Sequence, residues 1–473
     1  MFSSVSLPLW LVVLGALLAA WALMASVMLP GVRWVLRSRA NKVLEEVRSR
    51  LQIEIRPFQQ TRRQALVDLI TYDAKVQEAV AAEAKARGMT RELATARARY
   101  YAREIIPALN AYVYFRIGYW IARNFAQSLY RVRLGYADTE SLARIAPSAT
   151  VVFVMNHRSN MDYILAAYLA ADQAALSYAV GEWARIWPLQ QLIRAMGAYF
   201  VRRNSRDSLY RRVLERYVAM ATENGVTQAL YPEGGLSRDG LMREPRLGVL
   251  DYMLRTFNPE GERDIVFIPL GINYDRVLED RTLLLPDQAS KPGLARAAIN
   301  TLAFLAHQAA LMLRSKWRCF GYACVNFGTP ISMRDYTRRS GFDFRRLPTD
   351  ERFRRIAELG SHLMRSVGTL VPVLPVPLVA SVFTASPEKR FSELELKAGA
   401  EALIEKLAER GAHIYVPRRD RDFAISAGLE MLRLRRLVEE DDGLYRAAAG
   451  ELTLLRYYAN SIAHLMQSTE VAN

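Results

Sequence analysis

Short apolar runs alternate with longer amphipathic segments between residues 150 and 335, and this alternation limits the folds open to the chain. The runs that we expect to form strands are residues 151–155, 174–179, 198–202, 227–231, 265–270 and 323–327. Segments such as 183–196 and 208–221 lie between them and predict helices. Strands that alternate with helices are typical of an α/β layer fold. We therefore predict a mixed, mostly parallel sheet flanked by helices, within a domain of residues 141–340.

The regions on both sides of this domain have a helical composition. Residues 33–140 are rich in Ala, Arg and Glu without strand-like alternation, and residues 341–473 are also predominantly helical in pattern. Within the first region, residues 112–134 interleave aromatic side chains with four arginines. That pattern fits a helix in a membrane interface, or a core-packed helix with a solvated basic edge. We predict two helical regions, and the first of them is membrane-proximal.

The N-terminus is uncharged over its first 31 residues. Residues 7–29 form an apolar run long enough to cross the roughly 30 Å hydrocarbon core of a bilayer as a helix. A cleaved signal peptide would need a basic start and a shorter apolar run. The first cations, at positions 33, 37, 39 and 42, all follow the run, and positive charge is enriched on the cytoplasmic side of membranes. We predict a transmembrane anchor over residues 1–32 with the bulk of the chain in the cytoplasm.

The formal net charge of +16 calls for an anionic partner. Nucleic acid, acidic lipid headgroups and a phosphorylated substrate all satisfy charge alone. No recognised nucleic-acid motif accompanies the charge, and the membrane explains it more directly. The only two cysteines, Cys319 and Cys324, provide no disulfide framework, and no Cys/His grouping has zinc-site spacing. We therefore expect anionic lipid as a partner, no nucleic acid and no metal.

A polar turn links the first predicted strand to the helix that follows it. His157 and Asp162 lie five residues apart there, and such positions on a continuous helix differ by about 140° in azimuth. Their side chains can meet only if His157 precedes a helix that begins near Asn160. An aspartate that accepts from one ring nitrogen fixes the tautomer and leaves the other nitrogen as a base. Alternatively, Ser159 and Asp162 form a helix-capping box, in which Asp162 only accepts from a backbone N–H.

Two further strand ends carry groups that suit an anion. Arg202 and Arg203 end one predicted strand, where α/β folds usually bind ligands. Residues 231–238 (YPEGGLSR) follow another strand and combine close backbone approach, a hydroxyl donor, a cation and an acceptor. The groups concerned are Glu233, Gly234, Ser237 and Arg238. Paired arginines are often solvated surface and Gly-Gly is often a turn, but three such strand ends in one layer favour a phosphorylated ligand.

The chain has no enzyme nucleophile in a Gly-x-Ser-x-Gly turn and no P-loop lysine. If His157 is a base, the hydroxyl that it activates therefore belongs to the substrate. A base, a phosphate site and a membrane surface together predict acyl transfer onto a small phosphorylated alcohol.

Four segments, in order, resemble the sequence blocks of the glycerolipid acyltransferases. The residues around the motif positions of these blocks resemble the bacterial glycerol-3-phosphate acyltransferase branch. The segments are residues 157–162 (H-x-x-x-x-D), 197–203, 233–238 and 268–274. Pro269 stands at the family's proline, and Arg246 stands where the family shows a basic residue after the third block. The resemblance runs from about residue 110 to the C-terminal end.

The resemblance implies transfer of a fatty acyl group from a thioester, on CoA or acyl carrier protein, to the sn-1 hydroxyl of glycerol 3-phosphate. His157 would deprotonate the hydroxyl, and Asp162 would orient His157. The implied substrate-binding residues are Arg202, Arg203, Glu233, Gly234, Ser237, Arg238, Arg246 and Pro269. No cofactor is implied beyond the acyl co-substrate. The implied location is the bacterial inner membrane, with the catalytic domain on the cytoplasmic side.

Two residues depart from the branch pattern. Pro232 is more familiar from the lysophosphatidate acyltransferases, and Leu236 stands where the glycerol-3-phosphate branch often has a basic residue. The acceptors dihydroxyacetone phosphate and lysophosphatidate therefore stay open. So does an inactive membrane lipid-binding protein of the same fold.

Overall fold

The computed structural model describes residues 56–110, 113–170, 176–180, 189–202, 205–284 and 320–467. The predicted anchor at 1–32 and Arg203 lie outside the described residues, as do parts of the predicted strand at 174–179 and of the predicted helix at 183–196. None of the helices in the described ranges is both long and apolar enough to cross a bilayer.

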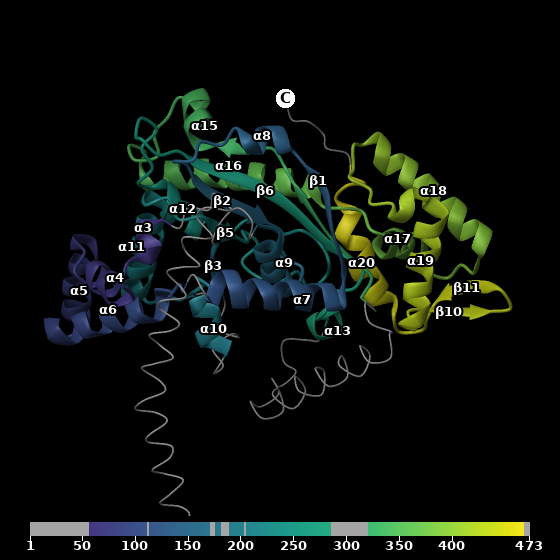
Figure 1. The fold of residues 1–473 in the computed structure, drawn as a ribbon, viewed down its shortest axis with the longest axis horizontal. Coiled ribbons are helices and arrows are strands. Elements are labelled where there is room, and N and C mark those ends of the chain that lie inside the picture. The colour runs from purple at the N-terminus through teal and green to yellow at the C-terminus, as the bar shows by residue number, and fades with distance from the viewer. Residues whose placement is uncertain are drawn as a thin grey trace, which may run out of the picture.

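A mixed, mostly parallel sheet forms the centre of the fold (Figure 1). Its strands are β1 (Arg131–Ala137), β2 (Thr150–Met155), β3 (Ser177–Val180), β4 (Tyr199–Phe200), β5 (Gln228–Leu230), β6 (Ile265–Tyr274), β7 (Tyr322–Phe327) and β8 (Ile331–Ser332). The hydrogen-bonded order is β1-β7-β6-β2-β5-β3-β4, and β8 pairs with β6. Strand β6 is antiparallel to β7 and β8, and the other pairs are parallel. The predicted α/β sheet is confirmed.

Strand β1 corrects the expectation of helix throughout residues 112–134. That segment contains a π-helical turn, η2 (Val113–Gly118), then α7 (Tyr119–Leu129), and only afterwards the strand. β1 lies at the edge of the sheet and none of its seven residues is fully buried. Residues 131–134 (RVRL) alternate cations and apolar side chains with period two, but this run is only four residues long and directly follows the helical segment at α7, so it reads as the end of that helix. The prediction of helix beyond residue 130 was wrong for this reason.

Helices cover the sheet and connect its strands (Figure 1). They are α8 (Thr139–Ala143), α9 (Met161–Ala170), α10 (Leu189–Ala195), α11 (Ser208–Glu223), α12 (Gly248–Leu254), α13 (Asp280–Leu283), α15 (Met333–Ser340) and α16 (Thr349–Leu370). Helix α11 begins where the sequence predicts it, because the side chain of Asp207 accepts from the backbone N–H of Tyr210 and caps the first turn.

The described N-terminal helices pack on α11. They are α3 (Pro57–Gln60), α4 (Arg63–Thr71), α5 (Ala74–Arg87) and α6 (Arg91–Ile105). Their buried side chains form one hydrophobic core with residues of α11 and with Val152 and Val154 of β2. An ion pair of 2.9 Å joins Arg216 of α11 to Asp73, the N-cap of α5. The N-terminal helices therefore pack directly against α11 and strand β2 of the central sheet.

The C-terminal region adds helices and a second, smaller sheet. Its elements are α17 (Pro375–Ala385), β9 (Phe391–Ser392), α18 (Glu393–Glu409), η4 (Pro417–Arg419), α19 (Arg421–Leu434), β10 (Val438–Asp441), β11 (Leu444–Ala447) and α20 (Leu452–Ala463). The strand order β10-β11-β9 is antiparallel throughout, and sequence reasoning anticipated none of these strands. They are two to four residues long, too short for a periodic signal.

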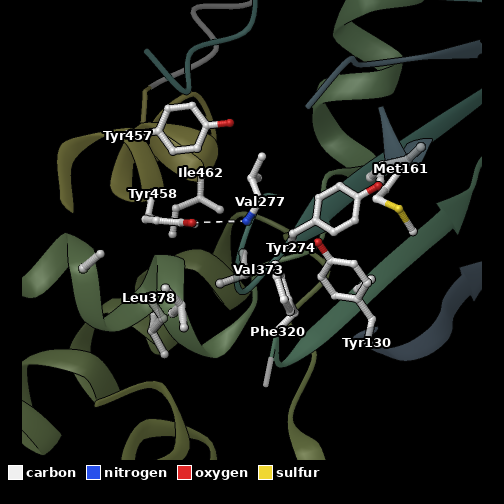
Figure 2. Close-up of a cluster of buried hydrophobic side chains, with 14 of the residues drawn as sticks. Tyr130, Met161, Tyr274, Val277, Phe320, Val373, Leu378, Tyr457, Tyr458 and Ile462 are labelled. Atoms are coloured by element: carbon white, nitrogen blue, oxygen red, sulfur yellow. Dashed lines mark hydrogen bonds between the residues drawn. The ribbon is translucent and has the colours of Figure 1, made fainter. Parts of the chain in front are cut away.

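A shared core joins the C-terminal region to the central sheet. Figure 2 shows Tyr458 and Ile462 of α20 facing Val277, which follows strand β6. The backbone N–H of Val277 donates to the hydroxyl of Tyr458 at 3.2 Å. Gly240 permits close approach on the same side, since a Cβ there would lie 1.9 Å from the carbonyl oxygen of Tyr457. Helix α20 is therefore fixed next to the loop that follows β5.

Candidate active site

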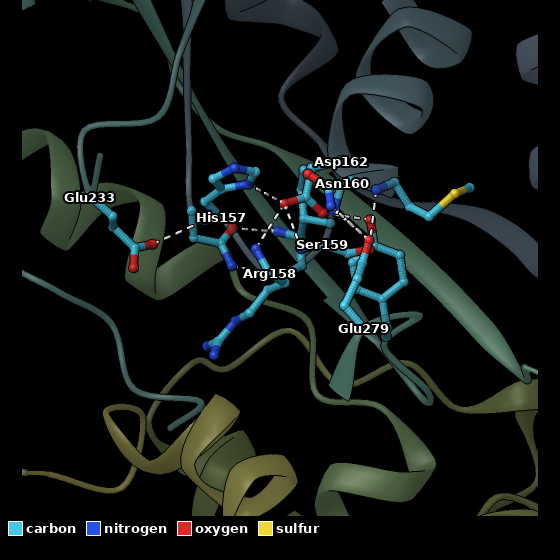
Figure 3. A network of polar contacts seen from close by, with 11 residues as sticks. His157, Arg158, Ser159, Asn160, Asp162, Glu233 and Glu279 are labelled. Carbon is cyan, nitrogen blue, oxygen red and sulfur yellow. Dashed lines mark hydrogen bonds and ion pairs between the residues drawn. The ribbon is translucent and has the colours of Figure 1, made fainter. Parts of the chain in front are cut away.

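The polar turn lies between β2 and α9, as predicted. Helix α9 begins at Met161, so His157 stands before the helix and Asp162 in its first turn. Nδ1 of His157 lies 2.9 Å from Oδ2 of Asp162, with both side chains buried (Figure 3). The contact expected from the five-residue spacing is present.

Asp162 has several donors besides His157. Its Oδ2 accepts from the backbone N–H groups of Arg158 at 2.7 Å and Ser159 at 3.0 Å. Its Oδ1 accepts from the hydroxyl of Tyr274 at 2.5 Å. The side chain therefore shapes the turn and orients the imidazole at the same time, so the two interpretations of Asp162 are not exclusive. These donors fix the carboxylate against the ring.

Two tyrosines enclose the imidazole of His157. The ring of Tyr231 lies 4.3 Å from it between centroids at an interplanar angle of 34°, and Tyr163 meets it edge-on at 5.4 Å. With the ring held between them and Nδ1 engaged by Asp162, Nε2 is the nitrogen left to exchange a proton with a substrate.

Glu279 holds the Ser159–Asn160 part of the turn, and sequence reasoning missed it. Its carboxylate accepts from the hydroxyl of Ser159 at 2.7 Å and from the side-chain amide of Asn160 at 3.0 Å (Figure 3). Burial raises the pKa of Glu279, and the Ser159 hydrogen bond opposes that rise. The carboxylate lies beyond strand β6, 120 residues after Ser159, and no local pattern connects the two.

Glu233 and Arg158 hold the backbone of the turn. Oε1 of Glu233 accepts from the N–H of His157 at 3.0 Å, while its buried Oε2 has no hydrogen-bond partner in the described part of the chain. Burial raises the pKa of Glu233, and the charge of Arg158 opposes the rise. The guanidinium of Arg158 is itself buried and donates to the carbonyl oxygens of Gly240 and Ser461.

A cavity of about 320 Å³ opens beside His157, and we call it the His157 cavity. Its walls are largely apolar and aromatic, with three arginines among them. The lining residues are His157, Tyr163, Val201, Arg202, Ser205, Tyr210, Arg211, Leu214, Leu230, Tyr231, Pro232, Gly234, Arg246, Gly248, Val249 and Tyr252. A base, cations and apolar walls thus border one space, which suits a ligand with both an anionic and a hydrocarbon part.

The three arginines of the cavity differ in the partners that they bind. Arg202 forms two hydrogen bonds, of 2.8 and 2.6 Å, with the carboxylate of Glu104 on α6, and this pairing raises its pKa. Arg211 on α11, which sequence reasoning missed, is exposed and has no carboxylate partner in the described residues. Arg246 joins the wall from the loop after β5, and its backbone N–H donates to the carbonyl of Pro232 at 2.8 Å.

Gly234 is a glycine for a local reason. Its φ is +71°, and a Cβ there would lie 2.4 Å from Cδ of Arg246. The side chain of Arg246 therefore passes directly over a position that only glycine fills without strain or displacement.

The other predicted binding residues lie apart from the cavity lining. Ser237 is buried; its N–H donates to the carbonyl of His157 at 3.0 Å and its hydroxyl to the carbonyl of Leu241 at 2.7 Å. Arg238 is exposed, and Pro269 is buried in β6 opposite Val154. The structure thus brings His157, Arg202, Gly234 and Arg246 to one cavity, with Glu233 and Ser237 bracing the turn behind it. The described residues include no group of three or more His, Cys, Asp or Glu side chains that could hold a metal ion.

Comparison with known proteins places two family matches along the chain. The family described as acyltransferase matches residues 137–273, and the glycerol-3-phosphate acyltransferase C-terminal region matches residues 309–469. The glycerol-3-phosphate acyltransferase of Xanthomonas axonopodis pv. citri is 26% identical over 92% of this chain and 48% of its own length. That of Pseudomonas putida is 28% identical over 85% of this chain and 49% of its own length. The chain therefore spans about half the length of these curated relatives.

The solved structures that resemble this chain include the 1-acyl-sn-glycerophosphate acyltransferase of Thermotoga maritima. It shares 17% sequence identity, and the match covers 65% of this chain and 97% of that chain. The TM-score is 0.31.

Proposed function

We propose that this chain, which belongs to the glycerolipid acyltransferase family, transfers a fatty acyl group to the sn-1 hydroxyl of glycerol 3-phosphate. The donor is a thioester of CoA or acyl carrier protein, and the product is lysophosphatidate, made in the first step of phospholipid synthesis. One observation carries the proposal: His157, held by Asp162 through Nδ1, lines a cavity that also contains arginines. The relatives named glycerol-3-phosphate acyltransferase support this choice of acceptor.

The chemistry needs one base and a held acceptor. Nε2 of His157 removes the proton of the substrate hydroxyl, and the oxygen attacks the thioester carbonyl carbon. The new C–O bond forms, the C–S bond breaks, and the departing thiolate takes the proton from the imidazolium. Asp162 stabilises that imidazolium while it exists. Base catalysis of this kind contributes about 10²–10⁴ in rate, so substrate positioning supplies much of the remainder.

The acceptor phosphate is assigned to the cations of the His157 cavity. Arg211 is better placed than Arg202, because the charge of Arg202 is already matched by Glu104, and Arg246 lines the same cavity from the loop after β5. Arg202, held by Glu104, serves mainly to position the cavity wall. The remaining members of the proposed binding set rest on the family resemblance: Arg203, Glu233, Gly234, Ser237, Arg238 and Pro269.

The proposal includes attachment to a membrane. Its support is the uncharged stretch of 31 residues at the N-terminus, the net charge of +16, and the exposed indole of Trp120 on α7. We place the enzyme at the bacterial inner membrane through a helix over residues 1–32, facing the cytoplasm and anionic lipid.

Lysophosphatidate is the second candidate acceptor. Pro232 favours it, and the apolar walls of the His157 cavity suit an acceptor that carries an acyl chain. Dihydroxyacetone phosphate is a third acceptor to be compared. The intact contact between His157 and Asp162 argues against an inactive lipid-binding protein.

The test uses the full chain in mixed micelles with palmitoyl-CoA or palmitoyl carrier protein and each of the three acceptors. We expect labelled lysophosphatidate from glycerol 3-phosphate, and a rate lowered about 10²–10⁴-fold in His157→Ala. His362→Ala, which removes an exposed histidine on α16, is the matched control and should leave the rate unchanged. No transfer from either donor to any acceptor would overturn the proposal.

A further inference from the structure

A second cavity, of about 600 Å³, borders the same loop as the first, and we call it the His464 cavity. The loop between β5 and α12 contributes residues 242–244 to it and contributes Gly234 and Arg246 to the His157 cavity. Helix α16 and the end of α20 supply other walls. The cavity is nearly twice the volume of the first, so it suits a ligand larger than glycerol phosphate.

Positive charge predominates in the His464 cavity. Arg243, Arg365 and Arg410 line it, against a single carboxylate, Glu244. Arg243 comes no closer than 4.0 Å to its neighbour Asp239. The guanidinium of Arg410 donates to a backbone carbonyl, and that of Arg365 has no ion-pair or hydrogen-bond partner in the described ranges. Of the three, Arg365 and Arg410 have no carboxylate partner in the described residues, and arginines gathered in one concave site are what phosphate recognition uses.

His464 adds a neutral acceptor to this cationic wall. Nε2 of its ring lies 3.0 Å from the carbonyl oxygen of Gly368, so Nε2 carries the proton. Burial lowers the pKa of His464 to about 4, which leaves the ring neutral near pH 7. Nδ1 is then an acceptor, and it is buried without a hydrogen-bond partner in the part of the chain that the structure describes. A ligand that satisfies both features has a phosphate and also a hydroxyl or N–H donor.

We infer that the His464 cavity binds an organic phosphate ester that also carries a hydroxyl or amino group, outside the site of acyl transfer. Two sources have this chemistry. One is the nucleotide end of an acyl-CoA donor, and this source rests on the proposed function. The other is the headgroup of an anionic phospholipid such as phosphatidylglycerol. In either case the ligand would contact α16, α20 and the loop that also shapes the His157 cavity.

The position of the His464 cavity couples it to the turn at His157. The loop between β5 and α12 donates the N–H of Ser237 to the carbonyl of His157, and its Gly240 accepts from Arg158. Arg158 also bonds to the carbonyl of Ser461 on α20. A ligand that bridges the loop and α20 would therefore stabilise the two elements between which Arg158 is held.

The test measures binding to the full chain in uncharged detergent micelles by calorimetry, with two probes. Desulfo-CoA represents the donor and short-chain phosphatidylglycerol represents the lipid. The variants are Arg365→Gln and Arg410→Gln. Arg354→Gln is the matched control, since this exposed arginine is on α16 but outside the cavity lining. Circular dichroism confirms that each variant is folded.

We expect each cavity variant to raise the Kd about tenfold, the effect of losing one charge-assisted hydrogen bond, and the control to leave it unchanged. Weaker binding of desulfo-CoA alone assigns the cavity to the donor, weaker binding of the lipid alone assigns it to the membrane, and both results support the inference. A Kd that neither variant changes for either probe would overturn it. Acyl transfer to glycerol 3-phosphate by these same variants is the separate readout of the proposed function, and it would stand if only the inference fails.

Discussion

His157 is buried and His464 is half-buried, each lines a cavity that the loop between β5 and α12 borders, and they differ in their partners. Nδ1 of His157 bonds to the carboxylate of Asp162, whereas Nε2 of His464 bonds to the carbonyl of Gly368. For His464, burial lowers the pKa to about 4, so the ring stays neutral and takes no proton near pH 7. The comparison teaches that burial without a carboxylate partner favours the neutral ring. A carboxylate partner is needed to stabilise the charged ring that a base must form.

Replacing Asp162 with Asn should break the comparison most severely. The substitution keeps the shape of the side chain but removes the charge that stabilises the His157 imidazolium, so we expect kcat to fall about 10²–10⁴-fold. Acyl transfer measured on protein that still shows a cooperative thermal transition tests this. A folded variant with kcat within a few-fold of wild type would show that His157 does not depend on Asp162.

His464→Gln should change how the unfolding free energy of the protein depends on pH. The pKa of His464 in the folded state, about 4, lies below the ordinary value of 6.5, so the unfolded chain binds more protons between these pH values. The wild type therefore loses about 3 kcal/mol of unfolding free energy through His464 as the pH falls from 7 to 4.

The glutamine variant keeps a donor for the Gly368 carbonyl but does not titrate. We expect its stability relative to wild type to rise as the pH falls, in urea unfolding at pH 7 and pH 4.5. Parallel losses of stability in the two proteins would contradict the assignment.

Tyr274→Phe should weaken the hydrogen bonding of Asp162, the partner of His157, without abolishing it. The phenylalanine removes the donor to Oδ1 of Asp162, while the two backbone donors remain. We expect the unfolding free energy to fall by about 1.5–3 kcal/mol, the usual effect for a hydrogen bond to a charged group, with a smaller loss in kcat. Tyr457→Phe is the control, because the buried Tyr457 hydroxyl has no partner in the described residues. Equal losses of unfolding free energy in both variants would show that the hydrogen bond from Tyr274 to Asp162 does not stabilise the protein.

Gly234→Ala should produce the smallest change, in the acceptor KM. Its backbone strain, about 1–2 kcal/mol for a positive φ, is shared by Gly443→Ala at φ +74°, where no atom lies within 4 Å of the added Cβ. Only the first variant displaces Arg246, so only it should raise the KM for glycerol 3-phosphate, by about threefold. The KM values of the two variants, measured side by side, isolate the role of Arg246. An unchanged KM in Gly234→Ala would remove Arg246 from the phosphate site.

The sequence predicted the site where its parts are local. His157 and Asp162 meet because a short turn joins the end of β2 at Met155 to the start of α9 at Met161, and both elements have clear sequence patterns. Tyr274 and Glu279 could not be placed in this way, since they reach the turn only through the pairing of β6 with β2. The pairing of Arg202 with Glu104, 98 residues upstream, was equally hidden. Strand β1 was missed because its alternation, residues 131–134 (RVRL), is only four residues long and directly follows a helical segment.

The buried guanidinium of Arg158 has a consequence for how such proteins diverge. Arg158 lies within the residues matched by the acyltransferase family, and Ser461, which accepts its hydrogen bond, lies within the separately matched C-terminal region. A gene fusion that joined the first region to an unrelated tail would leave a buried cation short of an acceptor, which is strongly destabilising. Recombination that preserves activity would therefore have to transmit both segments as a single hereditary unit.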